Sequence, residues 1–248
     1  MTELNIKVYR DLMGANEKWA QKTRELLGKT DTIMLNLIGS PGSGKTTLLE
    51  SSVRSLSSTD GARARNRPDG EAFSGLSSGW RFAVLVGDVE TTHDAERLAK
   101  LNCTVSQLLS GWGCHLEAKM VHYALKDLPL EQIDMVIVEN VGNLVCPAEF
   151  DLGEHAKVAV LSITEGEDKP AKYPLLFRES KAVILTKLDL LPHLKFDVKS
   201  CLNYIHQVNQ SLPVLQVSAQ TGKGMKKWIQ WLKTFEKTCK EGFSKAKE

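Results

Sequence analysis

The sequence carries almost no net charge, no secretion signal and no long hydrophobic run. Its 248 residues have a formal net charge of +2, and the basic residues are not gathered in one block, which argues against nucleic acid as a partner. The amino terminus has no hydrophobic signal-peptide core, and no apolar run approaches the roughly 20 residues that span a bilayer, so we expect no membrane association. The five cysteines are odd in number and scattered, which predicts reduced thiols and a cytoplasmic location.

Apolar segments of strand length alternate with segments of helical periodicity along the chain. The composition is 42% hydrophobic and 25% charged, and 248 residues suffice for one large domain with a substantial core. Strands separated by helices predict an α/β fold, in which a mostly parallel sheet has helices on both faces. The expected strands are 33–38, 82–86, 104–109, 135–138, 156–163, 182–186 and 214–217, and the expected helices are 46–56, 94–100, 116–126 and one around 228–239.

Two further segments complete a single domain that we expect to span residues 1–248. Residues 7–27 place their hydrophobic side chains near one helical face, which predicts an amphipathic amino-terminal helix. Residues 51–79 are rich in Ser, Gly, Arg and Asp, so beyond the first helical turns we expect a flexible insertion between helix and strand. A plain solvated loop accounts for this composition.

The clearest chemical motif is the glycine-rich segment GSPGSGKT at residues 39–46. It matches G-x-x-x-x-G-K-[ST] and lies between an expected strand and an expected helix, the context that a P-loop requires. In such a loop backbone N–H groups surround phosphate oxygens, the lysine reaches the β- and γ-phosphates, and the threonine hydroxyl binds Mg²⁺. The motif predicts a P-loop NTPase fold. The nucleotide-binding residues expected here are Gly39, Pro41, Gly42, Ser43, Gly44, Lys45, Thr46 and Thr47, with Lys45 also acting in catalysis and Thr46 holding magnesium.

A second motif indicates which base is bound. Thr186-Lys187-Leu188-Asp189 follows an expected strand and matches the T/N-K-x-D pattern of guanine-specific P-loop proteins. The Asp189 carboxylate can accept from both the N1–H and the exocyclic amine of guanine, whereas adenine would leave it unpaired at a cost of about 1–3 kcal/mol. Ser218 and Ala219 follow the last expected strand, and we expect them to support the base. Because T-K-x-D alone is a weak signal, a surface turn after a strand is the alternative.

Acidic residues end two other expected strands, where the ligand crevice of a parallel sheet opens. Asp88 and Glu139 occupy these positions, and each could hold Mg²⁺ directly or through water. Gly142 has E-x-x-G spacing with Glu139, so its N–H could meet a γ-phosphate. Asp94 is expected in a loop from which it could orient the attacking water in phosphoryl transfer. Asp88 and Asp94 could instead cap helices.

Three residues with nitrogen or sulfur ligands make a candidate soft-metal site. Cys114 and His115 are adjacent and are expected to open a helix, whose dipole would lower the thiol pKa below its free value of about 8.5. Cys146 follows Gly142 by four residues, so a segment that senses phosphate also carries a metal ligand. Such a set suits Zn²⁺ or Ni²⁺, and a two-fold dimer could combine two sets. The alternatives are a buried thiol beside a surface imidazole for Cys114 and His115, and a packed thiol for Cys146.

These motifs together resemble one family, the hydrogenase nickel incorporation GTPases called HypB. The resemblance runs from about residue 36 to residue 225, outside the 51–79 insertion. It is carried by SPGSGKTTLLE at 40–50, GDVETTHDAER at 87–97, GCHL at 113–116, ENVGNLVCP at 139–147 and TEGEDKPAKYP at 164–174. The positions of Cys114, His115 and Cys146 match the metal ligands of this family.

The resemblance implies both an activity and a set of partners. It implies a GTP-dependent homodimer that binds GTP or GDP with Mg²⁺, hydrolyses GTP, and binds nickel or zinc at the subunit interface. It further implies that the nucleotide switch helps deliver nickel to the large subunit of [NiFe]-hydrogenase, with a HypA-type metallochaperone as partner.

The sequence departs from the family pattern in three places. It lacks the CxxCGC motif and the histidine-rich tract that some members carry near the amino terminus, so we expect no high-affinity nickel site there. Thr186 stands where the family usually has Asn, which removes one amide contact in the guanine motif. The 51–79 insertion has no recognised counterpart.

Three other functions stay open on the sequence alone. A urease-type nickel-delivery GTPase would carry Cys-Pro-His, whereas Cys114 and His115 are adjacent here. A P-loop small-molecule kinase would need an acceptor pocket and would not need Asp189. A passive metal-binding protein would not need an intact P-loop with acidic strand ends.

Overall fold

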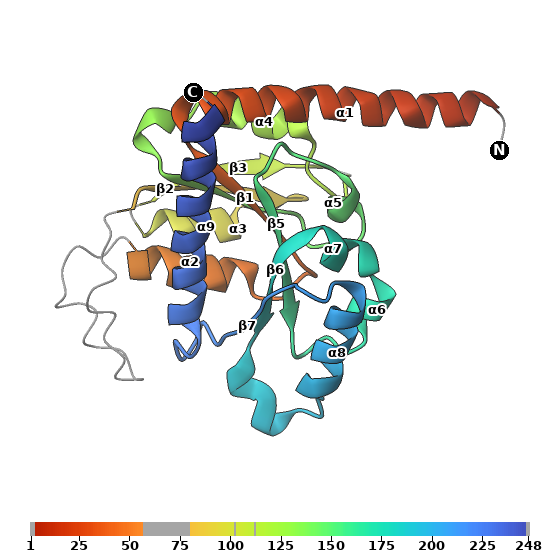
Figure 1. Cartoon of the computed structure of the whole chain (residues 1–248), viewed down its shortest axis with the longest axis vertical. Helices are drawn as coiled ribbons and strands as arrows, with labels where there is room; N and C mark the ends of the chain where they lie inside the picture. Colours follow the sequence, from red (N-terminus) through yellow and green to blue (C-terminus); the bar gives the residue numbers. More distant parts are fainter. Residues whose placement is uncertain (1–2, 57–79, 102, 112, 247–248) are drawn as a thin grey trace.

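A seven-stranded sheet organises the chain (Figure 1). The computed structural model describes residues 3–56, 80–101, 103–111 and 113–246. The strand order is β3-β2-β4-β1-β5-β6-β7, and every neighbouring pair is parallel. The strands are β1 (Ile33–Ile38), β2 (Phe82–Asp88), β3 (Thr104–Leu109), β4 (Met135–Glu139), β5 (Ala156–Ser162), β6 (Ser180–Thr186) and β7 (Val214–Gln216). The predicted α/β class with a parallel sheet is confirmed.

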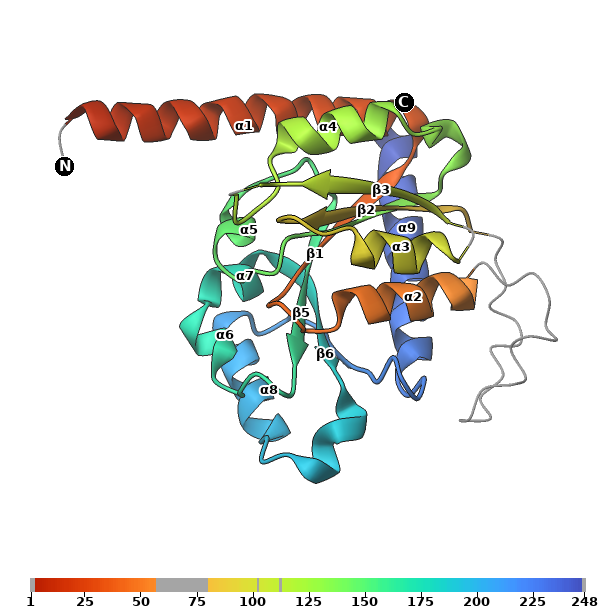
Figure 2. The same ribbon diagram turned by 180° about the vertical axis from the view of Figure 1, so that it is seen from behind.

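Helices cover both faces of this sheet (Figures 1 and 2). The α-helices are α1 (Glu3–Thr30), α2 (Lys45–Leu56), α3 (His93–Ala99), α4 (Ala118–Lys126), α5 (Cys146–Glu149), α6 (Lys169–Lys172), α7 (Pro174–Glu179), α8 (Val198–Val208) and α9 (Met225–Ala246). Two short 3₁₀ segments, η2 (Leu130–Gln132) and η3 (Leu188–His193), lie between them.

Strand alternation divides the core between the two faces. Successive side chains of a strand point to opposite faces, so Leu35 of β1 packs with α2, α3 and α9, whereas Met34 packs with α1 and α4. On that second face a further cluster joins β5 and β6 to α5, α7 and α8. Trp228 of α9 is fully buried and donates from Nε1 to the Ser52 hydroxyl of α2 at 2.9 Å. The helix that begins at Lys45 is therefore held on the sheet from its outer side.

Several predicted boundaries differ from the observed ones. The amino-terminal helix extends beyond 7–27, to Glu3–Thr30. The expected helix at 46–56 is observed as α2, so residues 51–56 of the segment expected as an insertion are helical, and residues 57–79 lie outside the described part of the chain. Helix α8 was not predicted, although Asp197 marks its start by accepting from Ser200 N at 3.1 Å.

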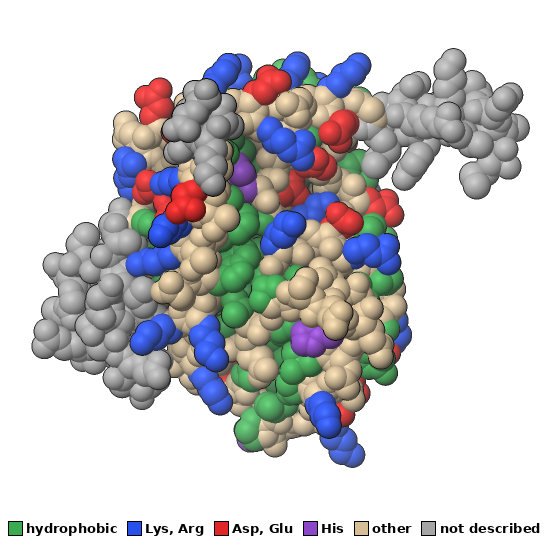
Figure 3. All heavy atoms as spheres, viewed as in Figure 1, with side chains coloured by type: hydrophobic (Ala, Val, Ile, Leu, Met, Phe, Trp, Pro, Cys, Tyr) green, Lys and Arg blue, Asp and Glu red, His purple; other side chains and the backbone are tan. Residues whose placement is uncertain are grey.

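The surface carries charged side chains of both signs. On the face seen in Figure 3, basic and acidic side chains are interspersed around a central hydrophobic area, with no single basic block. No helix within the described ranges is long and apolar enough to cross a membrane.

Candidate nucleotide and metal site

The loop at 39–46 joins β1 to α2 and folds around its own lysine. The Lys45 side chain is 6% exposed, and its Nζ donates to the carbonyl oxygens of Gly39 and Ser40, both at 3.1 Å. Burial lowers the pKa of Lys45, and the nearby acids, with Glu139 first, act in the opposite direction. An ammonium group thus lies inside the loop, where the motif places its phosphate contact.

Thr186 supports this loop from the neighbouring part of the sheet. Its hydroxyl lies 2.6 Å from the Ser43 carbonyl oxygen, to which it donates, and 3.3 Å from that of Leu161. Gly44 has a φ of 94°, a backbone conformation that favours glycine, and an added Cβ there would lie 3.7 Å from the Thr186 hydroxyl. The residue that replaces the usual Asn of the guanine motif is therefore a direct contact of the P-loop backbone.

Oxygen atoms suited to magnesium meet at the end of β4. The Thr46 hydroxyl donates to Glu139 Oε1 at 2.8 Å, while the buried Glu139 Oε2 has no hydrogen-bond partner among the described residues. Burial raises the pKa of Glu139 to about 7, against the opposing effects of Lys45 and Thr46. A buried carboxylate oxygen without a partner beside a threonine hydroxyl suits a small divalent cation that prefers oxygen ligands.

Asp88 and Asp94 lie in different local settings. Asp88 ends β2, and its carboxylate accepts from Val89 N at 2.6 Å and from the Thr91 hydroxyl. The expected helix at 94–100 is close to the observed α3, and Asp94 lies in its first turn rather than in the loop before it. Helix α3 begins at His93, because the Glu96 N–H already donates to the Thr92 carbonyl at 2.9 Å.

Arg97 links Asp94 to the helix that follows the P-loop. Its guanidinium donates to Asp94 Oδ1 at 2.9 Å and to Glu50 Oε2 at 2.9 Å, and it lies 3.4 Å from the Thr47 hydroxyl. Helix α3 is therefore attached to α2 near the phosphate loop, which keeps Asp94 at the edge of the candidate site. Arg97 was not predicted from the sequence as a site residue.

The two loops expected to bind the base are in direct contact. The Ser218 hydroxyl donates to Asp189 Oδ1 at 2.5 Å and accepts from Thr221 N at 3.1 Å. Lys187 adopts a left-handed φ of 61°, and its Cε would lie 3.9 Å from a Cβ added at Gly44. The structure thus brings Lys187, Asp189 and Ser218 together beside the P-loop, with Ala219 next in the same loop.

The segment after β4 lies against the P-loop. A Cβ added to Gly142 would lie 2.8 Å from Pro41 Cγ and 2.9 Å from its Cα. Contacts this short exclude any larger residue unless the backbone moves, so Gly142 allows the two backbones to approach closely. The expected γ-phosphate contact of Gly142 is therefore compatible with its position.

Cys114, His115 and Cys146 form one cluster. Their ligand atoms all lie within 4.8 Å of one another, and Cys114 Sγ is 3.6 Å from His115 Nδ1. The His115 ring stacks on Phe150 with the ring centroids 3.7 Å apart. Two thiols and an imidazole at this separation are a donor set for Zn²⁺ or Ni²⁺.

The expected thiol activation by a helix dipole is not supported. Helix α4 begins at Ala118 with Glu117 as its N-cap, so Cys114 and His115 precede the helix. For Cys146, at the start of the short α5, contact with the Cys114 thiol and burial raise the pKa. Burial lowers the pKa of His115, which favours the neutral imidazole that metals bind.

A polar connection between the two sites escaped the sequence analysis. Asn36 and Asn140 are buried, and Asn140 donates from Nδ2 to Asn36 Oδ1 at 3.1 Å. Asn140 Oδ1 also accepts from Leu116 N at 3.3 Å, and Asn143 Nδ2 donates to the Cys114 carbonyl at 3.2 Å. An asparagine within the apolar run of β1 was a usable signal, because buried polar groups need partners.

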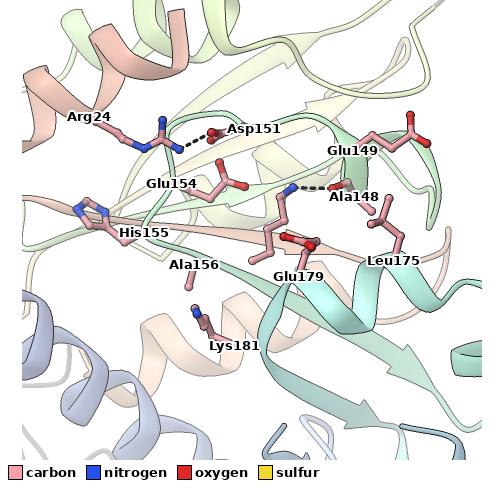
Figure 4. Close-up of a pocket in the computed structure, with 11 residues that line it drawn as sticks. Arg24, Ala148, Glu149, Asp151, Glu154, His155, Ala156, Leu175, Glu179 and Lys181 are labelled. Atoms are coloured by element: carbon pink, nitrogen blue, oxygen red, sulfur yellow. Dashed lines mark hydrogen bonds and ion pairs between the residues drawn. The ribbon is translucent and has the colours of Figure 1, made fainter. Parts of the chain in front are cut away.

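A separate cavity lies at the amino ends of β5 and β6 (Figure 4). Its volume is about 480 Å³, and charged side chains of both signs line it, among them Arg24, Asp151 and Glu179. Lys157 donates to the Ala148 carbonyl of α5 at 2.6 Å. Since nucleotides bind beyond the carboxyl ends of parallel strands, this cavity is not the candidate nucleotide site.

The fold and the phosphate loop together define a P-loop NTPase-type protein. Residues 72–216 match the family model described as CobW/HypB/UreG, nucleotide-binding domain. The chain is 43% identical over 227 residues to the hydrogenase maturation factor HypB of Azotobacter vinelandii, an alignment covering 92% of this chain and 68% of that protein. It therefore belongs to the HypB family of hydrogenase maturation factors.

Solved structures of the same family superpose on this chain. The crystal structure of HypB from Helicobacter pylori in complex with nickel aligns with a TM-score of 0.79 and 32% identity, covering 90% of this chain and 96% of that one. The structure of the hydrogenase maturation factor HypB from Archaeoglobus fulgidus aligns with a TM-score of 0.76 and 30% identity, covering 90% and 99%.

Proposed function

We propose that this protein is a GTP-hydrolysing metallochaperone that binds nickel or zinc and assists nickel insertion into [NiFe]-hydrogenase. One observation carries the proposal: Cys146, which clusters with Cys114 and His115, lies on the same short segment that contacts the P-loop through Gly142. Since the seven strands of the described residues belong to one sheet, we propose a single G domain that contains both sites. The five free thiols suit the reducing cytoplasm, where we place this function.

For nucleotide binding, we assign the phosphates to residues 39–47 and the guanine to two loops. Lys45 would leave the carbonyls of its own loop to meet the β- and γ-phosphates, which present stronger acceptors. Asp189 would accept from guanine, held in place by the hydroxyl of Ser218 with Ala219 beside it. Thr186 would act through the P-loop backbone, and Lys187 would lie over the loop next to Gly44.

For hydrolysis, we assign Mg²⁺ to Thr46, Glu139 and Asp88. The unpartnered Glu139 oxygen supports this choice. When bound, the cation would neutralise charge that develops on the phosphates. Asp94 would orient the attacking water, and Lys45 would stabilise the phosphoryl oxygens. The ion pair with Arg97 supports the role of Asp94, because it keeps the carboxylate at the edge of the phosphate loop.

For the metal cargo, we assign Cys114, His115 and Cys146 as ligands. The nickel complex of the Helicobacter pylori relative supports nickel as one cargo. Three ligands leave a coordination position open, which suits a metal that is passed on rather than kept. We expect a GTP-dependent homodimer that receives metal with a HypA-type metallochaperone and serves the hydrogenase large subunit.

The decisive experiment titrates Ni²⁺ and Zn²⁺ into the purified protein in its GDP-bound and GTP-analogue-bound states, with oligomer size and GTP turnover recorded. We expect GTP to bind in preference to ATP, slow hydrolysis, and metal binding that is weakened in Cys146→Ser. Nucleotide binding without metal should be unchanged in that variant. Metal binding that is identical in Cys146→Ser and the parent would refute the ligand assignment. Failure to hydrolyse GTP would refute the enzymatic part.

A further inference from the structure

The segment that carries Cys114 and His115 is attached to the segment after β4 at two points. At one point Leu116 N donates to Asn140 Oδ1 at 3.3 Å, and at the other Asn143 Nδ2 donates to the Cys114 carbonyl at 3.2 Å. Both contacts join residues far apart in the sequence. Two of the three clustered side chains therefore depend for their position on residues that lie between Glu139 and Cys146.

The Asn140 attachment is fixed in the core. Asn140 is 1% exposed and directly follows β4, and its Nδ2 donates to the fully buried Asn36 of β1. Its Oδ1 accepts from Val141 N at 2.9 Å as well as from Leu116 N. Breaking this set would leave buried polar groups unpaired, so we expect it to persist when a ligand binds.

The attachment through Asn143 lies nearer the surface than the one through Asn140. Asn143 is partly exposed, and it directly follows Gly142, whose backbone lies against Pro41 of the P-loop. Its Oδ1 accepts from Val145 N at 2.9 Å, so the same side chain bridges the Cys114 backbone and the residue before Cys146. The Asn143 side chain thus joins the segment that contacts the phosphate loop to the backbone of both cysteine segments.

We propose that Asn143 is a positioning residue that makes metal affinity depend on the bound nucleotide. The inference rests on the proposed function, because it requires that GTP and a soft metal bind at the sites assigned above. Gly142 moves when its N–H meets a γ-phosphate, and Asn143 moves with it. The contact to Cys114 is already 3.2 Å long, and such bonds weaken beyond about 3.5 Å, so a small displacement alters it. Cys146 then shifts relative to Cys114 and His115, while Asn140 keeps the latter segment in place.

The test uses two substitutions at Asn143 and one elsewhere. Asn143→Ala removes the hydrogen bonds of the side chain to Cys114 and Val145, whereas the nearly isosteric Asn143→Asp keeps an acceptor for Val145 N, loses the donor to Cys114 and adds a negative charge, which acts in both nucleotide states. Asn203→Ala, on the exposed side of α8, is the matched control. Ni²⁺ and Zn²⁺ affinities of the full chain are measured with Mg²⁺ and either GDP or a non-hydrolysable GTP analogue. GTP affinity without metal is measured in parallel.

The expected readout is the ratio of the metal affinities in the two nucleotide states. In the parent protein we expect the metal affinities of the two nucleotide states to differ by about 5–150-fold, the typical range for coupling between two sites. Both Asn143 variants should reduce this ratio by about twofold to tenfold, the effect of one neutral hydrogen bond, while GTP affinity without metal stays at the parental value. A variant that had merely lost structure would lower both affinities together, and Asn203→Ala should change neither.

Three results would overturn the inference, and they are distinguishable. An unchanged ratio in both Asn143 variants refutes the role of Asn143 and leaves the metallochaperone proposal intact. Equal metal affinities in both nucleotide states of the parent refute any coupling. A parent protein that binds no metal refutes the proposed function, and the role of Asn143 with it.

Discussion

Replacement of Thr186 by Val tests whether the hydroxyl of this residue anchors the P-loop for nucleotide binding. In the structure its hydroxyl donates to the Ser43 carbonyl at 2.6 Å and lies 3.3 Å from the Leu161 carbonyl, and its side chain is buried. Valine has nearly the same shape, so the substitution creates little cavity and mainly removes this donor. The Ser43 carbonyl then loses its partner inside the protein.

The magnitude of this effect follows from the unpaired carbonyl. Leaving one buried acceptor unsatisfied costs about 1–3 kcal/mol, and for a protein of about 150–250 residues each kcal/mol lowers Tm by roughly 2–4 °C. We therefore expect Thr186→Val to lower Tm by about 2–12 °C. We also expect weaker binding of GTP and GDP alike, because the anchored loop surrounds the phosphates that both nucleotides share.

The measurement combines thermal unfolding of the nucleotide-free protein with GTP and GDP titration. Thr186→Ser keeps the hydroxyl and should retain most of the nucleotide affinity. Thr238→Val, at an exposed position of α9 where the hydroxyl donates to the Thr234 carbonyl at 3.0 Å, should change stability by no more than about 0.5 kcal/mol. If Thr186→Val unfolds at the parental temperature and binds both nucleotides normally, the anchoring role is wrong.

Three further predictions concern the nucleotide site. Asp189→Ala should weaken GTP binding and narrow the preference over ATP in competition titrations, and parental discrimination would disprove its assignment to guanine. Asp94→Ala should bind GTP normally but turn it over slowly in a phosphate-release assay, and parental turnover would exclude the water-orienting role. Glu139 has its pKa raised from 4.5 to about 7, so the stability it contributes is present below about pH 4.5 and is lost as the pH rises through 7. Without Mg²⁺, Glu139→Gln should therefore gain up to about 3 kcal/mol over the parent between pH 5 and pH 8, at about 1.4 kcal/mol per pKa unit. A gain independent of pH in urea unfolding would contradict the burial argument.

Buried strands and glycine-rich loops were predictable from the sequence because their signals are local. The expected strands at 33–38 and 104–109 match β1 and β3 at both ends, and the others differ by a few residues. Strands buried on both faces, such as β1 and β4, are mostly apolar, and this is visible without knowledge of their neighbours, whereas β3 at the sheet edge is only partly buried. The P-loop motif is equally local, since a single turn supplies its glycines and its lysine.

Helix boundaries were harder to predict, and so were the roles of residues whose position depends on contacts with distant parts of the chain. The helix expected at 94–100 is observed as α3, but the sequence did not show that Arg97 joins Asp94 within this helix to Glu50 of α2. Cys114 was expected at a helix start, whereas residues 114–117 are irregular, with Leu116 N donating to Asn140 and the Cys114 carbonyl accepting from Asn143. These contacts could not be predicted because the partners lie far away in the sequence.

The sequence by itself determined the α/β class, the P-loop, the guanine motif and the three candidate metal ligands, because each depends on residue type and short-range spacing. Only the tertiary structure decided that Thr186 supports the P-loop and that the two cysteine segments meet. It also decided that an asparagine between Gly142 and Cys146 connects them. Parallel strands distant in sequence end at the same edge of the sheet, so their loops become neighbours only once the sheet has formed.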